Sequence, residues 1–187
     1  MVWNSDVLTP PPSPPPSTSS SLPPPLPPPR REGSMNDYLA WFDGACEPVN
    51  PGGTASFGVV IKDNAGTVLV KEHGIAGKGR AMSNNLAEYA GVLHILKYLS
   101  SRPPGRATIH GDSNLVINQL SGRWRIRKGL YLSIATESKE LLAHLSGLGW
   151  QINLCWIPRA HNSECDALSR TDAPRHDRNS SLLPALG

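Results

Sequence analysis

The chain has 187 residues and a formal net charge of +3, and 39% of its residues are hydrophobic. This size fits one folded domain with tails, and the small positive charge tolerates a polyanionic partner without requiring one. The sequence contains no long apolar run, so we expect neither a secretory signal nor a membrane span. The three cysteines lack metal-ligand spacing, which favours reduced thiols in a cytoplasmic compartment.

The first part of the chain is rich in proline. Residues 1–34 hold twelve of the nineteen prolines, in runs of three that are separated mainly by serine and threonine. Such a stretch lacks amide donors and apolar bulk, so we predict a disordered, polyproline-like arm outside any core. Proline runs of this kind can dock on SH3- or WW-type grooves. The folded domain is then expected at residues 35–171, and residues 172–187 are expected to form a loose tail.

Hydrophobic periodicity predicts the elements of the domain in chain order. Glycine-rich loops are expected at 44–53 and 74–82, and a hairpin turn at 63–66. The predicted elements are strands at Tyr38–Asp43, Ser56–Asp63 and Thr67–His73, a helix capped by Ser83 and ending at Leu99, a strand at Ala107–Gly111, helices at 113–120 and 129–145, a strand at Gln151–Ile157 and a helix at 162–169 capped by Asn162. This order predicts an α/β fold with a five-stranded mixed sheet flanked by helices.

Two acidic residues follow two of the predicted strands. Asp43 ends the first strand, and Asp112 comes directly after the fourth. A helix links these strands, so we expect them to be parallel neighbours whose carboxyl ends open at one crevice, where α/β sheets usually bind ligands. Alone, each acid could simply be solvated at a strand end or cap a helix.

A third acid, Glu88, precedes Val92, Ile95 and Leu99 by helical spacings and therefore lies in their apolar stripe. An ionised acid in such a place costs several kcal/mol unless a cation or a donor compensates it. A fourth acid, Asp166, lies on the last predicted helix. Four acids without a matching set of buried arginines or lysines suggest a divalent metal site, and hard oxygen ligands favour Mg²⁺ or Mn²⁺ over zinc.

Four short motifs contain these acids. They are Phe42-Asp43-Gly44-Ala45 with Asn50-Pro51-Gly52-Gly53, then Ser83-Asn84-Asn85-Leu86-Ala87-Glu88-Tyr89, then Gly111-Asp112-Ser113-Asn114-Leu115-Val116, and last His161-Asn162-Ser163-Glu164-Cys165-Asp166. Through them the chain resembles the type 1 ribonuclease H family, especially its compact bacterial and archaeal branch, from about Asp37 to Ser169. The resemblance implies a ribonuclease H-like fold and an endoribonuclease that hydrolyses the RNA strand of RNA–DNA hybrids, leaving 5′-phosphate and 3′-hydroxyl ends.

The resemblance also implies which residues act. Asp43, Glu88, Asp112 and Asp166 would be the catalytic carboxylates that bind two Mg²⁺ ions, with Mn²⁺ as a substitute. In such a site the two ions activate the attacking water and stabilise the leaving oxygen. His161 would take the place of a mobile catalytic histidine that moves a proton or aids product release.

Substrate contacts are implied in the same way. Candidates for contacts to the RNA 2′-hydroxyl are Glu88, Asn85, Asn114 and the backbone near Cys46. Ser83 and Asn84 match a pocket for a phosphate of the DNA strand. Where many members carry a long basic protrusion, this chain has a short basic run, whose contact candidates are Arg123, Trp124, Arg125, Arg127 and Lys128. A solvated surface is an equally good interpretation of that run.

Two other functions remain open at the level of sequence. A ribonuclease H-like nuclease could act on another substrate, as an exonuclease or a junction resolvase. Alternatively, the domain could be a non-catalytic, nucleic-acid-binding adaptor that works through its proline-rich arm. We expect a monomer that binds an RNA–DNA hybrid.

Overall fold

The computed structural model describes residues 36–170, so the predicted arm at 1–34 and the predicted tail at 172–187 lie outside the described residues. The elements in chain order are β1 (Asn36–Glu47), β2 (Thr54–Asp63), β3 (Val68–Lys78), α1 (Asn84–Ser100), β4 (Gly105–Gly111), α2 (Asn114–Leu120), α3 (Leu132–Gly147), β5 (Gln151–Trp156), the short 3₁₀ turn η1 (Arg159–His161) and α4 (Ser163–Ser169). In the part of the chain that the structure describes, no helix is both long and apolar enough to cross a membrane.

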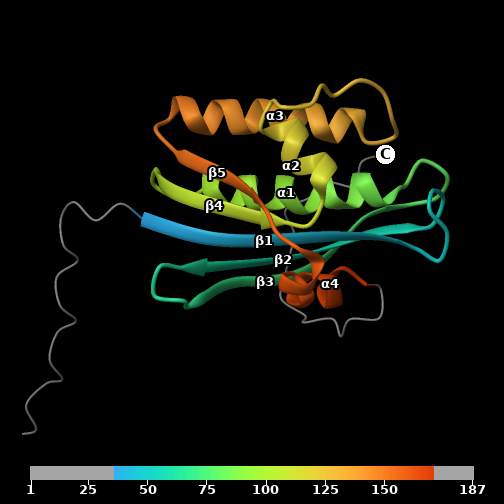
Figure 1. Cartoon of the computed structure of the whole chain (residues 1–187), viewed down its shortest axis with the longest axis horizontal. Helices are drawn as coiled ribbons and strands as arrows, with labels where there is room; N and C mark the ends of the chain where they lie inside the picture. Colours follow the sequence, from blue (N-terminus) through green and yellow to red (C-terminus); the bar gives the residue numbers. More distant parts are fainter. Residues whose placement is uncertain (1–35, 171–187) are drawn as a thin grey trace, which may run out of the picture. The chain divides into compact units, whose positions relative to one another are not determined.

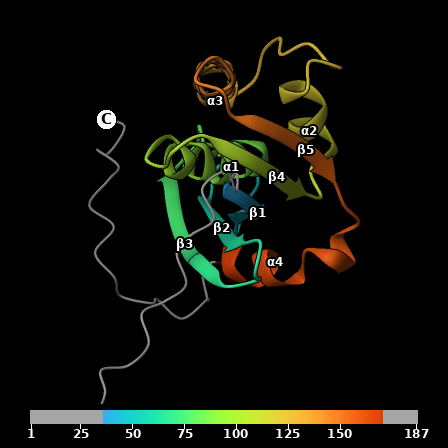
Figure 2. The same cartoon turned by 90° about the vertical axis from the view of Figure 1, so that its left-hand side faces the viewer.

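The strands form one mixed sheet with the order β3-β2-β1-β4-β5. β1 pairs antiparallel with β2 and parallel with β4, and β4 pairs parallel with β5. Helices α1, α2 and α3 lie on one face of the sheet, and α4 lies on the opposite face (Figures 1 and 2). The predicted five-stranded mixed sheet and the parallel pairing of its first and fourth strands are therefore confirmed.

Strand β1 is longer than the sequence predicts, and this changes the position of Asp43. The loop expected from Gly44 is wrong for its first four residues, because residues 44–47 pair with residues 54–57 of β2. Pairing of β1 with β4 ends earlier, at Phe42 opposite Gly111. Asp43 therefore lies inside a strand, just beyond the point where the neighbouring parallel strand stops.

Two other predicted boundaries are wrong for local reasons. β3 continues through Gly74, because a Cβ there would lie 2.3 Å from the Phe57 ring, so this glycine makes room for an aromatic side chain rather than for a loop. α3 begins at Leu132 and not at Gly129, whose φ of 152° forms a turn closed by the Leu132 amide. The hairpin turn after Asp63 is confirmed, with Gly66 at a φ of 82°.

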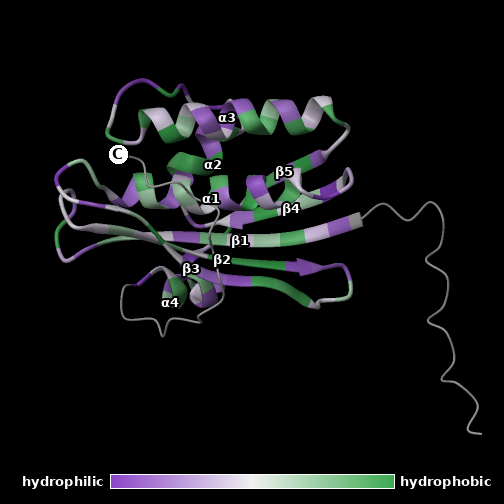
Figure 3. Ribbon diagram, turned by 180° about the vertical axis from the view of Figure 1, so that it is seen from behind, coloured by the Kyte–Doolittle hydropathy of each residue, from purple (hydrophilic) through white to green (hydrophobic). Residues whose placement is uncertain are grey.

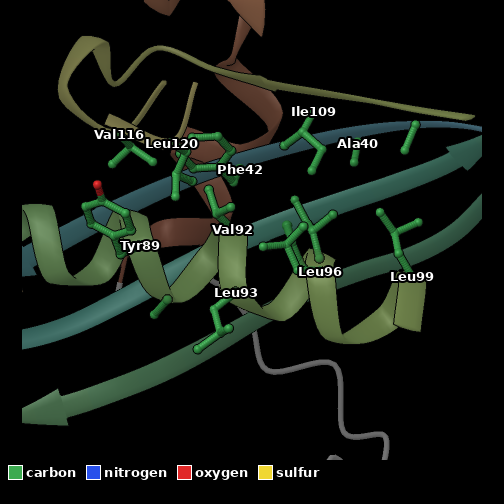
Figure 4. Close-up of a cluster of buried hydrophobic side chains, with 14 of the residues drawn as sticks. Ala40, Phe42, Tyr89, Val92, Leu93, Leu96, Leu99, Ile109, Val116 and Leu120 are labelled. Atoms are coloured by element: carbon green, nitrogen blue, oxygen red, sulfur yellow. The ribbon is translucent and has the colours of Figure 1, made fainter. Parts of the chain in front are cut away.

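Helix α1 covers the core side of the sheet. It begins as predicted after Ser83, whose hydroxyl accepts a hydrogen bond from the Leu86 amide. Its buried side chains point towards the strands (Figure 4), and the cluster there includes Ala40, Phe42, Tyr89, Val92, Leu93, Leu96, Leu99, Ile109, Val116 and Leu120. Burying each large apolar side chain contributes about 1.5–3 kcal/mol, so this cluster fixes how α1 sits on β1 and β4.

Strand β2 is buried on both faces, because α1 packs on one side of it and α4 on the other. Its middle is accordingly drawn in the hydrophobic colour, whereas α3 alternates between hydrophobic and hydrophilic segments (Figure 3). Helix α4 approaches β2 most closely at Gly58, where a Cβ would lie 2.5 Å from the Leu168 Cβ and 2.6 Å from the Cys165 carbonyl oxygen. This close approach sets the position of α4 and of the Asp166 that it carries.

We predict that Gly58→Ala displaces α4 and lowers the free energy of unfolding by about 1–3 kcal/mol, because overpacked backbone contacts relax only partly. Urea unfolding measures the change. Gly147→Ala is the matched control, since nothing lies within 4 Å of a Cβ there and the position is helical. The control should leave the free energy of unfolding unchanged or raise it by up to about 1 kcal/mol, because alanine favours a helix over glycine. Equal effects of the two substitutions would contradict the assigned role of Gly58.

Candidate active site

The four acids predicted from the sequence come from four elements and meet at one end of the sheet. Asp43 lies on β1, Glu88 on α1, Asp112 directly after β4, and Asp166 on α4. Asp43 and Glu88 are buried, with 4% and 8% of their surfaces exposed, and the other two acids are partly buried. The charges of Asp112 and Asp166 both act on the Asp43 carboxyl, so the four groups share one electrostatic neighbourhood.

Gly44 explains how Glu88 comes close to Asp43. A Cβ at Gly44 would lie only 2.2 Å from the Glu88 backbone nitrogen. The first turns of α1 can therefore rest directly on β1 only if this residue has no side chain. The close packing of α1 on β1 thus explains why the residue after Asp43 in the first motif is a glycine.

Glu88 is held by two neutral donors. The Ser113 hydroxyl donates a short hydrogen bond to Oε2, and the Asn84 side-chain amide donates to Oε1 at 3.1 Å. Burial, together with the charges of Asp43 and Asp112, raises the pKa of Glu88 to about 7, although the hydrogen bond from Ser113 and the charge of Arg159 lower it. Ser113 also caps α2, so one hydroxyl connects the start of that helix with the buried acid.

Asp43 is held by the end of α4. The Ser169 hydroxyl donates to Asp43 Oδ2 at 2.6 Å, and the Ser56 hydroxyl donates to the Ser169 carbonyl oxygen at 2.6 Å. Burial raises the pKa of Asp43 to about 6; Ser169 lowers it, and the charges of Asp112 and Asp166 raise it. Neither serine could be recognised in the sequence, because a serine in a strand or at a helix end gives no pattern of its own.

Asn162 has a different role from the predicted helix cap. α4 does begin after Asn162, but the Asn162 side chain makes no capping hydrogen bond. Its Nδ2 instead donates to the Phe42 carbonyl oxygen at 2.8 Å and to Asp112 Oδ1 at 2.9 Å. The side chain is 1% exposed, and its Oδ1 is the one buried side-chain oxygen or nitrogen among residues 36–170 without a hydrogen-bond partner. Asn162 therefore ties α4 to the ends of β1 and β4.

Two arginines contact the fourth acid. Arg159 donates a short hydrogen bond to Asp166 Oδ1, and Arg170 Nη2 lies 3.3 Å from Asp166 Oδ2. Asp166 therefore has two cationic partners that were not predicted from the sequence, where only a matching set of buried arginines or lysines was considered. Both arginine side chains are exposed, at 65% and 51%, so this positive charge lies at the rim and leaves the buried acids without a buried cation.

Arg159 could have been noticed in the sequence. It follows the last predicted strand and precedes Asp166 by seven residues, although the predicted catalytic residue in this segment is His161. His161 is exposed on η1. A pocket of about 130 Å³ opens beside the acids, and His161 does not line it. The side chains that bring charge or polarity to its wall are Asp43, Cys46, Glu47, Asn84, Arg159, Asp166, Ser169 and Arg170.

The other predicted substrate contacts are accessible to different degrees. Ser83 is the N-cap of α1, Asn85 is partly buried in its first turn, and Asn114 is exposed at the start of α2. The basic run between α2 and α3 is exposed at each of its predicted contacts, which are Arg123, Trp124, Arg125, Arg127 and Lys128. These substrate roles stay predictions.

The four acids have the ligand chemistry of a site for a hard divalent cation. As the side chains stand, no three His, Cys, Asp or Glu residues within 36–170 are arranged to hold a metal ion. Asp43, Glu88, Asp112 and Asp166 each make a hydrogen bond to a protein donor. Carboxylate oxygens suit Mg²⁺ or Mn²⁺, and the mutual repulsion of partly buried acids is what a divalent cation relieves. The donor set therefore fits such an ion in its chemistry, although its side chains make hydrogen bonds to protein donors in this arrangement.

We predict that Asn162→Ala lowers the free energy of unfolding by about 1–3 kcal/mol, because it leaves the Phe42 carbonyl and the Asp112 carboxylate without their donor. Urea unfolding checks this value. Asn153→Ala, at an exposed position of β5, is the control and should change stability by less than about 0.5 kcal/mol. If Asn162→Ala behaves like the control, the buried amide does not link these elements.

The raised pKa values of Asp43 and Glu88 predict a pH dependence of stability without divalent cations. Below about pH 3 both acids are largely protonated in the folded and unfolded states, because the ordinary pKa values are 3.8 for Asp43 and 4.5 for Glu88. As the pH rises towards about 7, the unfolded state releases these protons first, so the free energy of unfolding falls through this window. At about 1.4 kcal/mol per pKa unit, the loss is roughly 3 kcal/mol per acid.

Urea unfolding in a chelator at about pH 4.5 and about pH 7.5 measures this loss. Glu88→Gln should remove the contribution of Glu88 to the difference in the free energy of unfolding between the two pH values. The acids with lowered pKa values, Asp37 and Glu164, act in the opposite direction and at lower pH, so they do not produce this decline. An unchanged difference in Glu88→Gln would contradict the prediction.

Comparison with known proteins agrees with this architecture. Residues 41–171 match the model of a family described as reverse transcriptase-like. A bifunctional protein of Mycobacterium tuberculosis is 31% identical over 120 residues, which are 64% of this chain and 31% of that protein. A ribonuclease HI of Halobacterium salinarum is 33% identical over 130 residues, 70% of this chain and 61% of that protein. The chain thus spans about a third to three fifths of the length of these relatives.

Solved structures of the same two relatives have the same fold. The N-terminal RNase H domain of the M. tuberculosis protein, fused to maltose-binding protein, has a TM-score of 0.61 and 30% identity, covering 71% of this chain and 90% of that one. RNase H1 of H. salinarum has a TM-score of 0.59 and 28% identity, covering 71% and 93%. With its ribonuclease H-like sheet and its four motifs in order, the chain belongs to the type 1 ribonuclease H family.

Proposed function

We propose that this protein is an endoribonuclease that hydrolyses the RNA strand of RNA–DNA hybrids with the help of two Mg²⁺ ions, leaving 5′-phosphate and 3′-hydroxyl ends. The observation that carries the proposal is the meeting of four carboxylates from four elements at one end of the sheet, where the charges of the other acids act on Asp43 and Glu88. Two of them, Asp43 and Glu88, are buried with raised pKa values. A site that only stabilised the fold would have no need for converging acids that repel one another.

The acids would hold the ions, with Mn²⁺ as a substitute. When bound, two divalent ions activate a water and stabilise the leaving oxygen of a phosphodiester. Asp43 is central to the donor set, because the charges of both Asp112 and Asp166 act on it. Ser169, Ser113 and Asn162 hold Asp43, Glu88 and Asp112 by hydrogen bonds that do not cancel their charge. These donors fix the direction of each carboxylate without competing for the role of the cation.

The choice of substrate rests on the family and on the residues around the acids. The H. salinarum relative bears the name ribonuclease HI, and the matching part of the M. tuberculosis relative is described as an RNase H domain. Asn84 and Cys46 line the pocket beside Asp43, and Asn114 is exposed next to Asp112, so polar groups are available near the place where a 2′-hydroxyl would identify an RNA strand. We propose that the exposed basic run after α2 contacts the phosphates of the hybrid.

We predict that the purified full chain with Mg²⁺ cleaves the labelled RNA strand of a hybrid, and that a chelator abolishes cleavage. Asp43→Asn and Asp112→Asn should each lower kcat by at least about 100-fold, because an amide is a poor ligand for a divalent ion. Asp37→Asn is the matched control. It makes the same chemical change at the other end of β1, where Asp37 pairs with Arg106, and should leave the rate unchanged.

The same assay separates the competing functions. Labelled hybrid, duplex DNA, single-stranded RNA and a four-way DNA junction are supplied at equal concentration. Preferential cleavage of the junction would indicate a resolvase, and stepwise loss of end nucleotides an exonuclease. Binding without cleavage of any of these substrates would favour the adaptor. Full cleavage of the hybrid by Asp43→Asn would overturn the site assignment.

A further inference from the structure

We propose that Arg159 is a phosphate-binding residue of this site, and that Asp166 and the nucleic-acid backbone compete for its guanidinium group. The proposal deepens the proposed function, since it adds a substrate contact and an order of events to the same nuclease site. It concerns a residue to which the sequence motifs assign nothing, and it follows from the position, the charge and the exposure of one side chain.

The backbone of Arg159 is held firmly between two of the acids. The Ile157 amide donates to the Gly111 carbonyl oxygen at 3.0 Å, which extends the contact between β5 and β4 beyond the end of the sheet pairing. The Asn162 amide then donates to the Arg159 carbonyl oxygen at 2.9 Å. The turn that carries Arg159 is therefore anchored on one side beside Asp112 and on the other at the start of α4.

The guanidinium group of Arg159 stands among the acids. It bonds to Asp166, lines the pocket together with Asp43, and its charge acts on Asp43, Glu88 and Asp112 as well. Arg170 contacts Asp166 alone of the four acids, at 3.3 and 3.4 Å from its two oxygens. Both arginines line the pocket, but Arg159 is the one whose charge acts on all four acids, which places it where a phosphate approaching them would arrive.

The ion pair with Asp166 is suited to exchange. The Arg159 side chain is 65% exposed and that of Asp166 is 23% exposed, and ion pairs near the surface contribute little to stability. A guanidinium group has five N–H donors in a planar fork that matches the oxygens of a phosphate as well as those of a carboxylate. A backbone phosphate can therefore take over Arg159 and leave the Asp166 carboxylate free for a divalent cation.

Binding without cleavage tests the phosphate contact. The full chain is titrated with a fluorescent RNA–DNA hybrid in a chelator at several salt concentrations. Each phosphate contact contributes about 0.7–0.9 to the slope of log affinity against log salt concentration. Arg159→Gln should lower the magnitude of this slope by about that amount, and Arg159→Lys should keep most of it. Arg106→Gln, at an exposed pair with Asp37, is the control and should not change the slope.

Competition is tested by a double-mutant cycle in the same assay. Asp166→Asn removes the competing carboxylate and should raise hybrid affinity several-fold in the wild-type background. In the Arg159→Gln background the same change should raise affinity by clearly less, because only the general loss of negative charge remains. Calorimetric titration of the free protein with Mn²⁺ gives an independent readout, in which Arg159→Gln should bind the ion more tightly than the wild type.

Three results would overturn the proposal. They are an unchanged salt slope in Arg159→Gln, equal effects of Asp166→Asn in both backgrounds, and weaker Mn²⁺ binding by Arg159→Gln. Repeating the salt series with duplex DNA keeps the proposal separate from the proposed function. Suppose that the wild type cleaves no hybrid, but that Arg159→Gln lowers the salt dependence of duplex DNA binding. The proposed ribonuclease activity would then be wrong, and the phosphate contact of Arg159 would still hold.

Discussion

The site depends on the close burial of two acidic groups, Asp43 and Glu88, without a buried cation beside them. Their hydrogen-bond donors are neutral hydroxyl and amide groups, which satisfy carboxylate oxygens but do not cancel charge. The pKa values of both acids therefore stay raised, and each proton retained at neutral pH is one that a divalent cation could displace. The packing of the core and of helices α1 and α4 against the sheet holds the two acids close together despite their electrostatic repulsion.

Two glycines allow helices α1 and α4 to pack closely against the sheet. Gly44 lets α1 lie directly on β1 from one face, and Gly58 lets α4 lie on β2 from the other. Asp43 lies on the strand between these helices, at the point where β1 continues beyond β4. The hydroxyl of Ser169 and the amide of Asn162 then tie α4 to this same end of the sheet. The acids converge because backbone surfaces are in contact, so side chains far from the pocket can still control its geometry.

The sequence was sufficient to predict the sheet, the parallel central strands and the four acids, since these depend on hydrophobic periodicity and on motif order. It failed where a glycine had a packing role. Gly44 and Gly74 suggested loops, but each lies in a strand where a neighbouring backbone or an aromatic ring needs the space. It also missed Asn162 as a link between elements, because the partners of a buried amide, Phe42 and Asp112, are distant in sequence and follow no periodic pattern.

Arg159 shows why the electrostatics of a site are harder to predict than its ligands. The four acids were expected to bind a divalent metal because no matching set of buried arginines or lysines accompanied them in the sequence. The Arg159 guanidinium is 65% exposed, so water screens its charge more than that of a buried group, and other anions can reach it. It lowers the pKa of Asp43 and of Glu88 only slightly compared with the effect of burial, which comes first for both acids. Its charge is therefore too weakly coupled to neutralise the site, yet close enough to bind a phosphate that enters it.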